Sequence, residues 1–345
     1  ADDASSMSFG KDVTAWQKFF GYRPCLFKDG KVVGYLNPND FTKFENGTAA
    51  DITSGNAGDV MIQFPRKGVR ISKSGKIITV SMTESPDDPN FKYYAHQRGS
   101  MNKDYFYLGA YDGYVTGNKL RSLSGKTPTA SLEMNEFITY GKANGNGYGI
   151  IGYYQWLFLQ VMYVLQFKGN LNSQSIVGSG HVNERYDGSG DVFDTGRSNT
   201  RGMNFGNNSV VKLFGIEDIW GNIEQMVDNF YVSSTYQITT TTDDTITDVS
   251  NYTNWGAYGG TDSTGWEYYT DCVGTTEVGF MPLYDALNGS SSTYFCDNTS
   301  VKADCTVSVG GNFLGKESCG IFAMFVTCKR NGQWGGTLGS RLGFL

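Results

Sequence analysis

The feature that most constrains the fold is residues 149–167, GIIGYYQWLFLQVMYVLQF, a run without a single charged side chain. The pattern predicts a helix from about Tyr153 to Phe167, ending before Gly169, that is apolar on nearly every side. Because glutamines at 155, 160 and 166 interrupt the run, we interpret it as a buried helix rather than a membrane span. The rest of the chain must then supply a core that surrounds this helix.

The first third of the chain is typical of antiparallel strands. Apolar and polar residues alternate in KVVGYL, DVMIQF, VRISKSGKIITVSM and KDYFYLGAY. Within the third of these segments, SKSGK predicts a hairpin turn in which Gly75 adopts a positive φ. A second helix is expected over residues 131–140, with Ser131 as its N-cap and Gly141 at its end.

The second half of the chain is rich in turns. Residues 170–214 are dominated by Gly, Ser, Asn and Asp and predict long irregular loops. In GIEDIWGNIEQMVDNFYV, the spacing of Ile219, Ile223, Met226 and Val227 predicts a short helix, and TTTTDDTITD predicts an exposed hairpin or loop. CTVSVGG and GIFAMFVT predict strands. A central helix pair framed by twisted antiparallel strands defines the α+β class.

Composition excludes several classes of function. The net charge of −6 argues against nucleic-acid binding, which needs a clustered basic surface. The six cysteines contain no C-x-x-C spacing, so we expect buried thiols, with disulfides among the last four as an open alternative. The two histidines, His96 and His181, have no partner at metal-ligand spacing. No cofactor is expected.

The sequence carries no recognisable catalytic motif. A nucleophile elbow, a Walker loop and a dinucleotide-binding glycine motif are all absent. YDGSGDVFD offers oxygen atoms from Asp187, Ser189, Asp191 and Asp194, but an EF-hand needs glycine where Val192 stands. We therefore interpret this segment as a turn-rich loop, with a structural calcium ion as the alternative.

Three segments share a layout with a known family. FGIEDIWGNIEQMVDNFYV contains Gly221, Asn222, Glu224 and Asp228, and it is followed by VSVGGNF and by the terminal GSRLGF. This order resembles the formylglycine-generating-enzyme branch of the C-type lectin fold, which has a G-N-x-x-E-x-x-x-D element, a glycine-rich turn and a terminal strand. The resemblance implies one C-type-lectin-like domain over residues 1–345, with an N-terminal extension of about residues 1–55.

A second resemblance covers nearly the whole chain from about Gly21. GYLNPNDFTKFENGTAADITSGNAGDVMIQFPR, LRSLSGKTPTAS and NGSSSTYFCD are similar to phrases of tail-associated proteins of phages and prophages. In that group the C-terminal region is often the variable protein of a diversity-generating retroelement. Residues 305–345 would be the variable region here. Its constant positions, called the frame residues below, would be Gly310, Gly311, Gly320, Ile321, Phe322, Gly339, Ser340, Arg341 and Leu342.

The same resemblance implies a set of variable, ligand-binding positions, called the display residues below. They are Phe313, Leu314, Lys316, Glu317, Ala323, Phe325, Thr327, Lys329, Asn331, Gln333, Trp334 and Thr337. Aromatic and basic side chains on a fixed scaffold can supply binding hot spots to many partners.

The implied function is receptor binding by a phage or prophage tail adhesin, located on the virion or at the bacterial surface. Its partner would be a host-cell surface receptor or another macromolecule, such as a protein, with no nucleic acid and no membrane insertion. Attachment to other tail proteins and a homo-oligomer such as a trimer are compatible with the resemblance, although no coiled-coil heptads occur. The alternatives are a non-variable structural tail or surface protein and, disfavoured by the missing copper and iron ligands, an oxidase of the formylglycine-generating type.

Overall fold

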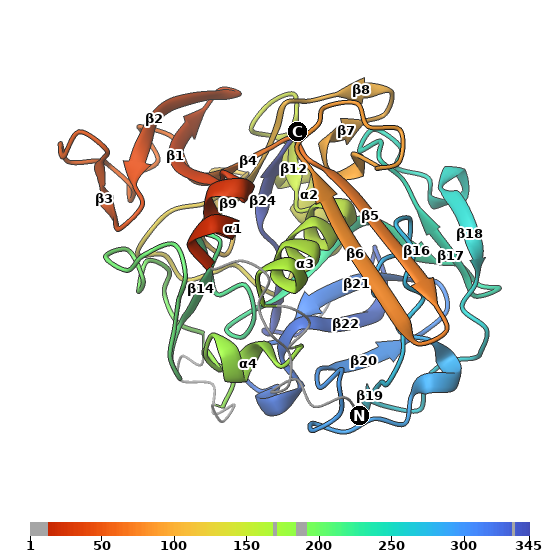
Figure 1. Cartoon of the computed structure of the whole chain (residues 1–345). Coiled ribbons are helices and arrows are strands. Elements are labelled where there is room, and N and C mark those ends of the chain that lie inside the picture. Colours follow the sequence, from red (N-terminus) through yellow and green to blue (C-terminus); the bar gives the residue numbers. More distant parts are fainter. Residues whose placement is uncertain (1–12, 168–170, 184–191, 333–334) are drawn as a thin grey trace.

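A computed structural model describes residues 13–167, 171–183, 192–332 and 335–345 of the chain. Helices make up 14% of the chain and strands 36%, so the protein is α+β and mainly β. Helix α3 (Tyr153–Phe167) has the predicted bounds and lies near the centre of the molecule, with the hairpin of β5 (Gly68–Ser74) and β6 (Ile77–Thr83) beside it (Figure 1). No helix in the described ranges is both long enough and apolar enough to cross a membrane.

Gln155 and Gln160 of α3 are buried, and each makes a hydrogen bond that helps to hold the helix. Nε2 of Gln160 donates to the carbonyl oxygen of Ile321 at 3.0 Å, which ties the helix to strand β22 (Gly320–Cys328). Oε1 of Gln155 accepts the N–H of Gly152 at 2.9 Å, just before the first turn. A buried polar side chain is tolerated when it finds such a partner, so these glutamines do not interrupt the core.

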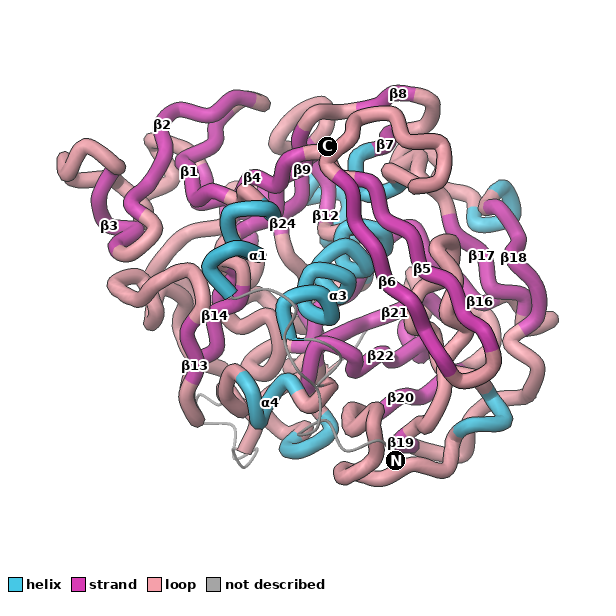
Figure 2. Tube along the Cα trace, in the orientation of Figure 1, coloured by secondary structure: helices cyan, strands magenta, loops and turns pink. Residues whose placement is uncertain are grey.

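One large sheet joins the N-terminal part of the chain to its C-terminal end (Figures 1 and 2). Its order is β12 (Tyr148–Ile150), β24 (Leu342–Phe344), β9 (Tyr105–Gly109), β4 (Asp59–Pro65), β1 (Arg23–Lys28), β2 (Lys31–Asn37) and β3 (Asp40–Phe44). Cys25, Leu26 and Phe27 of β1 are fully buried. Residues 23–44 therefore belong to the main sheet, whereas the sequence assigned them to an N-terminal extension.

The second sheet contains most of the C-terminal region. Its order is β18 (Thr253–Ala257), β17 (Gln237–Thr240), β16 (Glu224–Val232), β21 (Cys305–Gly310), β22, β20 (Asn298–Val301) and β19 (Glu267–Tyr268), with β23 (Leu338–Gly339) pairing with β16. Strand β20 runs parallel to β22 and strand β23 runs parallel to β16, and the other pairs, β19 with β20 among them, are antiparallel. The predicted strands CTVSVGG and GIFAMFVT are β21 and β22, so both predictions are confirmed.

Smaller elements complete the chain. The hairpins are β5 (Gly68–Ser74) with β6 (Ile77–Thr83), β7 (Gln97–Arg98) with β8 (Met101–Asn102), and β10 (Tyr114–Thr116) with β11 (Lys119–Arg121). Strands β13 (Phe205–Gly206), β14 (Val211–Leu213) and β15 (Ile216–Glu217) form a small sheet, and the short helices are α1 (Val13–Phe20), α2 (Met134–Lys142) and α4 (Ser173–Ile176). Gly75, in the β5–β6 turn, has φ of +59°, as predicted.

The predicted helix at residues 131–140 begins and ends later than expected. Its N-cap is Glu133, whose backbone N–H donates to the side chain of Glu136 at 2.8 Å in a capping box, and Ser131 lies outside the helix. Gly141 lies inside the last turn, where it packs against the backbone of Gly149, so an added Cβ would come within 2.6 Å of it. Glycine is present here for close approach to β12, not as a helix stop.

The predicted short helix at Ile219–Val227 is wrong. The segment leaves β15 through a turn in which Asp218, Gly221 and Asn222 all have positive φ, and it then enters strand β16. A left-handed residue ends regular right-handed helix. Seven of the nine residues of β16 are buried, all except Asn229 and Tyr231. A strand covered on both faces has buried residues at successive positions, which explains why the apolar residues of this segment do not simply alternate with polar ones.

A buried ion pair joins the C-terminal segment to the rest of the fold. Arg341 is 0% exposed, and its Nη2 lies 2.7 Å from the carboxylate of Asp112. Its remaining donors reach the side chain of Gln225 and the carbonyl oxygens of Gly109 and Glu217 at 2.8–3.0 Å. Burial raises the pKa of Asp112 and Arg341 offsets part of that increase. The frame residue Arg341 therefore connects the C-terminal segment to Gly109, Asp112, Glu217 and Gln225 through buried hydrogen bonds.

Candidate functional site

The display residues fall into four structural groups. Leu314, Lys316, Glu317, Lys329 and Asn331 are exposed; Thr327 and Thr337 are half-buried; Phe313, Ala323 and Phe325 are buried; Gln333 and Trp334 lie outside the described residues.

Surface display of Phe313, Ala323 and Phe325 is contradicted by the structure. Phe313 is 1% exposed and its ring packs near that of His181. Ala323 and Phe325 lie on β22, which has β21 on one side and β20 on the other. A strand in the interior of a sheet that is covered on both faces buries every side chain, and Gly320–Val326 are all buried.

The exposed display residues do not form one face. Lys316 and Glu317 lie in the short 3-10 helix η5 (Lys316–Ser318) before β22, whereas Lys329 and Asn331 follow its end. The nine residues of β22 span about 26 Å at the usual rise of a strand. At the far end, the side chain of Asn331 is hydrogen-bonded to Asn135 of α2.

A cavity of about 450 Å³ lies among the C-terminal loops, and four display residues line it. We call it the C-terminal cavity. Its volume is in the range of small-ligand pockets, about 300–1,000 Å³. It is lined by Glu224, Trp266, Gly311, Asn312, Leu314, Gly315, Ser318, Cys319, Phe325, Thr327, Gly335, Thr337 and Leu338.

The alternation of β22 explains which of its residues reach the cavity. Phe325 and Thr327 point to one face of the strand, and both line the cavity. Phe322, Met324 and Val326 occupy the alternate positions and belong to the main hydrophobic core. Over residues 322–327, the strand thus alternates core side chains at Phe322, Met324 and Val326 with cavity side chains at Phe325 and Thr327.

The loop before β22 forms another part of the wall and is held by specific contacts. Nε2 of Gln174, in α4, donates to the carbonyl oxygens of Lys316 and Cys319, each at 2.7 Å. Oδ1 of Asn312 accepts the N–H of Leu314 at 3.0 Å, which fixes the turn after the paired glycines. Leu314 itself is 39% exposed, so an apolar side chain is presented beside the cavity.

Trp266 is a site residue that the sequence analysis missed. It precedes β19, is 60% exposed, and its ring centroid lies 4.4 Å from that of Phe325 at an interplanar angle of 58°. A large exposed apolar side chain at the edge of a pocket is typical of binding surfaces. No local sequence pattern distinguishes TGWEYY from other turns, so the signal lies only in the tertiary contact.

Glu224, which the sequence analysis named only as part of the family element, is a second residue of the site. The side chain is buried, its Oε2 accepts from Nδ2 of Asn312 at 3.1 Å, and its Oε1 pairs with the hydroxyl of Ser308. Among the described residues, no Lys, Arg or His forms a salt bridge with it. Burial raises its pKa to about 7, and the bonds from Ser308 and Asn312 offset part of the increase.

The cysteines beside Glu224 are protonated thiols. All six cysteines are buried and free, which confirms the expectation of buried thiols and leaves no disulfide among the last four. Burial raises the pKa of Cys319 well above its usual value and that of Cys328 to about 12. Thiolate is the form that attacks substrates and binds metals, so neither residue has the environment of an activated cysteine.

The frame residues are buried in the structure. Gly310 and Gly311 have φ of +85° and +74°, and an added Cβ at Gly311 would lie 2.5 Å from Sγ of Cys319. At Gly320 an added Cβ would overlap the carboxylate of Asp297. These positions tolerate only glycine, because the backbone approaches its neighbours too closely for a side chain.

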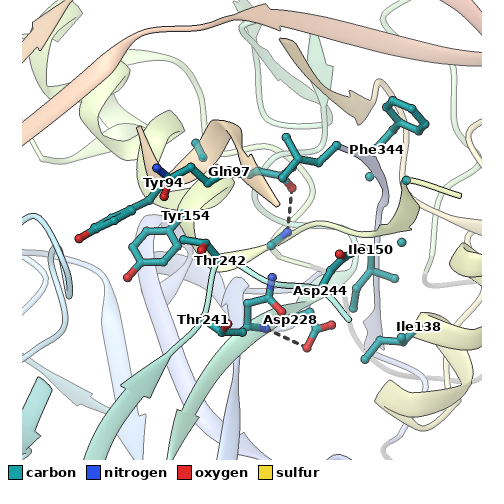
Figure 3. A pocket seen from close by; sticks show the side chains of 18 of the residues that line it. Tyr94, Gln97, Ile138, Ile150, Tyr154, Asp228, Thr241, Thr242, Asp244 and Phe344 are labelled. Carbon is teal, nitrogen blue, oxygen red and sulfur yellow. Dashed lines mark hydrogen bonds between the residues drawn. The ribbon is translucent and has the colours of Figure 1, made fainter. Parts of the chain in front are cut away.

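A second concavity lies between α2, β12, β16 and the end of the chain (Figure 3). Tyr94, Tyr154, Asp228 and Phe344 line it, and the N–H of Asn229 donates to the carboxylate of Asp228 at 2.8 Å. Its volume of about 40 Å³ is enough for little more than one water molecule. We therefore do not assign a ligand to it.

The structure does not identify a metal site. Among the described residues, no group of three or more His, Cys, Asp and Glu side chains could hold an ion. Of the loop considered for calcium, Asp187, Ser189 and Asp191 lie outside the described residues, and Asp194 accepts a hydrogen bond from the hydroxyl of Thr127 at 2.5 Å.

Comparisons with known proteins do not assign the chain to a family. No protein-family model matches it, and no curated protein has a significantly similar sequence. The α+β class and the geometry of the C-terminal cavity are therefore the basis for any statement about function.

Proposed function

We propose that the chain is a ligand-binding protein whose binding site is the C-terminal cavity and the exposed residues around it. The observation that carries the proposal is this cavity of about 450 Å³, which the C-terminal region encloses together with Trp266 and Glu224. Leu314 and Trp266 present apolar surface to solvent beside it. Loops and strand faces that line a cavity on a buried scaffold can change without loss of the core.

The finer proposal is that the scaffold is a C-type lectin fold of the formylglycine-generating-enzyme branch and that the chain is a diversified receptor-binding protein of a phage or prophage tail. The separation of the two residue sets supports it. The nine frame residues are all buried, whereas seven of the ten described display residues are exposed or half-buried. The fold name does not imply a sugar ligand, because fold alone does not determine function.

Within this proposal, the variable positions are those that reach solvent or the cavity. Among the described residues they are Leu314, Lys316, Glu317, Phe325, Thr327, Lys329, Asn331 and Thr337, and Gln333 and Trp334, outside the described residues, stay in the proposed set. Phe313 and Ala323 are removed from the set because they are buried and do not line the cavity. The partner remains a host-cell surface receptor or another macromolecule at the virion or bacterial surface.

Sequencing the locus from several isolates tests the proposal. The expected result is adenine-linked substitution at the proposed variable codons, a constant set of frame codons, and a neighbouring reverse-transcriptase gene with a near-copy of the coding sequence for residues 310–345. An identical C-terminal region in all isolates, or substitutions at Gly310, Gly311 or Arg341, would favour the alternative of a non-variable structural tail or surface protein.

A further inference from the structure

The chemistry of the C-terminal cavity is asymmetric in charge. Its described lining contains one carboxylic acid, Glu224, and no Lys, Arg or His. The exposed residues Lys316 and Glu317 carry opposite charges beside it, in η5 between the lining residues Gly315 and Ser318. The acid is therefore the only charge that the described lining offers to an occupant.

The carboxylate of Glu224 has unused hydrogen-bonding capacity. Each of its oxygens makes one side-chain hydrogen bond, to Ser308 or to Asn312, while an ionised carboxylate can accept about four. The titratable groups that interact with it are the thiols of Cys319 and Cys328, which are neutral. A buried carboxylate without a cation is unfavourable, and an incoming cation would remove that cost.

The aromatic part of the cavity suits the same occupant. The rings of Trp266 and Phe325 are in contact, and both residues line the cavity that Glu224 borders. Cations are attracted to the faces of aromatic rings, most strongly to tryptophan, and this attraction grows when the cation is partly desolvated. The methylene groups of a lysine side chain would pack against Leu314 and Leu338, which also line it.

We propose that the C-terminal cavity binds an alkylammonium group, supplied by a lysine side chain of a protein partner. This inference rests on the proposed function as a ligand-binding protein and adds the chemical class of the group recognised. The ammonium would pair with the Glu224 carboxylate beside the rings of Trp266 and Phe325, and the methylene groups would pack against Leu314 and Leu338.

The test uses the full chain labelled with ¹⁵N at the tryptophan indoles. The Trp266 signal is assigned by its loss in Trp266→Phe. Three probes are titrated at pH 8: the N-acetyl methylamides of lysine, of norleucine, which lacks the ammonium, and of arginine. The expected result is a saturable shift of the Trp266 signal with the lysine probe, at least tenfold weaker binding of norleucine, and weaker binding of arginine.

Two variants complete the test. Glu224→Gln should weaken lysine-probe binding at least tenfold, while Glu84→Gln, which removes an exposed charge from a residue that does not line the cavity, should leave it unchanged. The other indole signals report whether each variant is folded. Equal binding of lysine and norleucine probes, or no effect of Glu224→Gln, would overturn the cation assignment while leaving a ligand-binding cavity. Absence of binding by every probe, or tighter binding of the arginine probe than of the lysine probe, also overturns the proposal of a lysine-binding cavity. The isolate sequences test the proposed function separately.

Discussion

The exposed indole of Trp266 packs against the buried ring of Phe325, with ring centroids 4.4 Å apart. This contact joins the turn before β19 to strand β22 and places both side chains on the lining of the C-terminal cavity. Phe325 is fixed by its strand, whereas Trp266 retains 60% of its surface in solvent. The pair therefore joins a buried residue of the cavity wall to an exposed one.

The first prediction concerns Trp266. Trp266→Ala should reduce binding of the lysine probe at least tenfold, because it removes aromatic surface and a cation–π partner. Stability should fall by only about 1 kcal/mol, since most of the side chain is already exposed. Isothermal titration and urea unfolding measure the two effects. Trp255→Ala is the matched control, because Trp255 is also exposed but does not line the cavity; an equal loss of binding in both variants would contradict the prediction.

The second prediction is the pH dependence of lysine-probe binding. The ammonium pairs with the ionised form of Glu224, whose pKa is about 7 in the unliganded chain. Lowering the pH from 8 to 6 reduces the ionised fraction about tenfold, so affinity should fall about tenfold. Glu224→Gln should bind weakly and equally at both values. A wild-type affinity that does not change with pH is incompatible with pairing to Glu224.

Part of the fold could be predicted from local patterns. Helix α3 and strands β21 and β22 follow directly from hydrophobic periodicity, which is strong over long uniform segments. The apolar spacing of residues 219–227 predicts a helix wrongly, because over so few residues it fits the period of a helix as well as that of a strand. Asp218 and Asn222 have the left-handed backbone conformation that excludes a helix here, and tertiary contacts set this conformation.

The candidate site was only partly predictable. The resemblance to variable proteins identified Leu314, Phe325, Thr327 and Thr337, all of which line the C-terminal cavity. It could not identify Trp266, which lies about sixty residues before the strand it contacts. Exposure on β22 was also unpredictable, because a strand is buried on one face or both depending on neighbours that are distant in sequence.

The third prediction concerns stability and pH at Glu224. Its folded pKa of about 7 lies above the unfolded value of about 4.3, so the folded state binds the proton more tightly. The ionised, buried carboxylate therefore lowers the free energy of unfolding above about pH 7, and this loss of stability is absent below about pH 4. Glu224→Gln should be more stable than wild type by on the order of 3 kcal/mol at pH 8 and nearly equal at pH 4. Urea unfolding at both pH values measures the difference, and a constant offset would argue against a raised pKa.

The fourth prediction compares two glycines of the C-terminal region. Gly311→Ala places a side chain at φ of +74° and within 2.5 Å of Cys319 Sγ, whereas Cβ at Gly335 meets no atom within 4 Å. Gly311→Ala should destabilise the fold by at least ~1–2 kcal/mol from backbone strain alone. Gly335→Ala should change stability by less than about 0.5 kcal/mol. Thermal and chemical unfolding measure both, and similar effects would show that Gly311 is not a required frame position.

The fifth prediction concerns the buried cation of the frame. Arg341→Met leaves Asp112 without its partner and frees the carbonyl oxygens of Gly109 and Glu217. Removing one member of a buried pair typically costs about 3–5 kcal/mol. Arg23→Met breaks a salt bridge to Glu45 in which both side chains are more than two-fifths exposed, so it should cost about 1 kcal/mol or less. Equilibrium unfolding in urea compares the two variants. Equal losses of stability in the two variants would show that Arg341 does not hold the C-terminal segment in place. If only Arg341→Met is severely destabilised, position 341 cannot vary. It then belongs to the constant scaffold that carries the cavity.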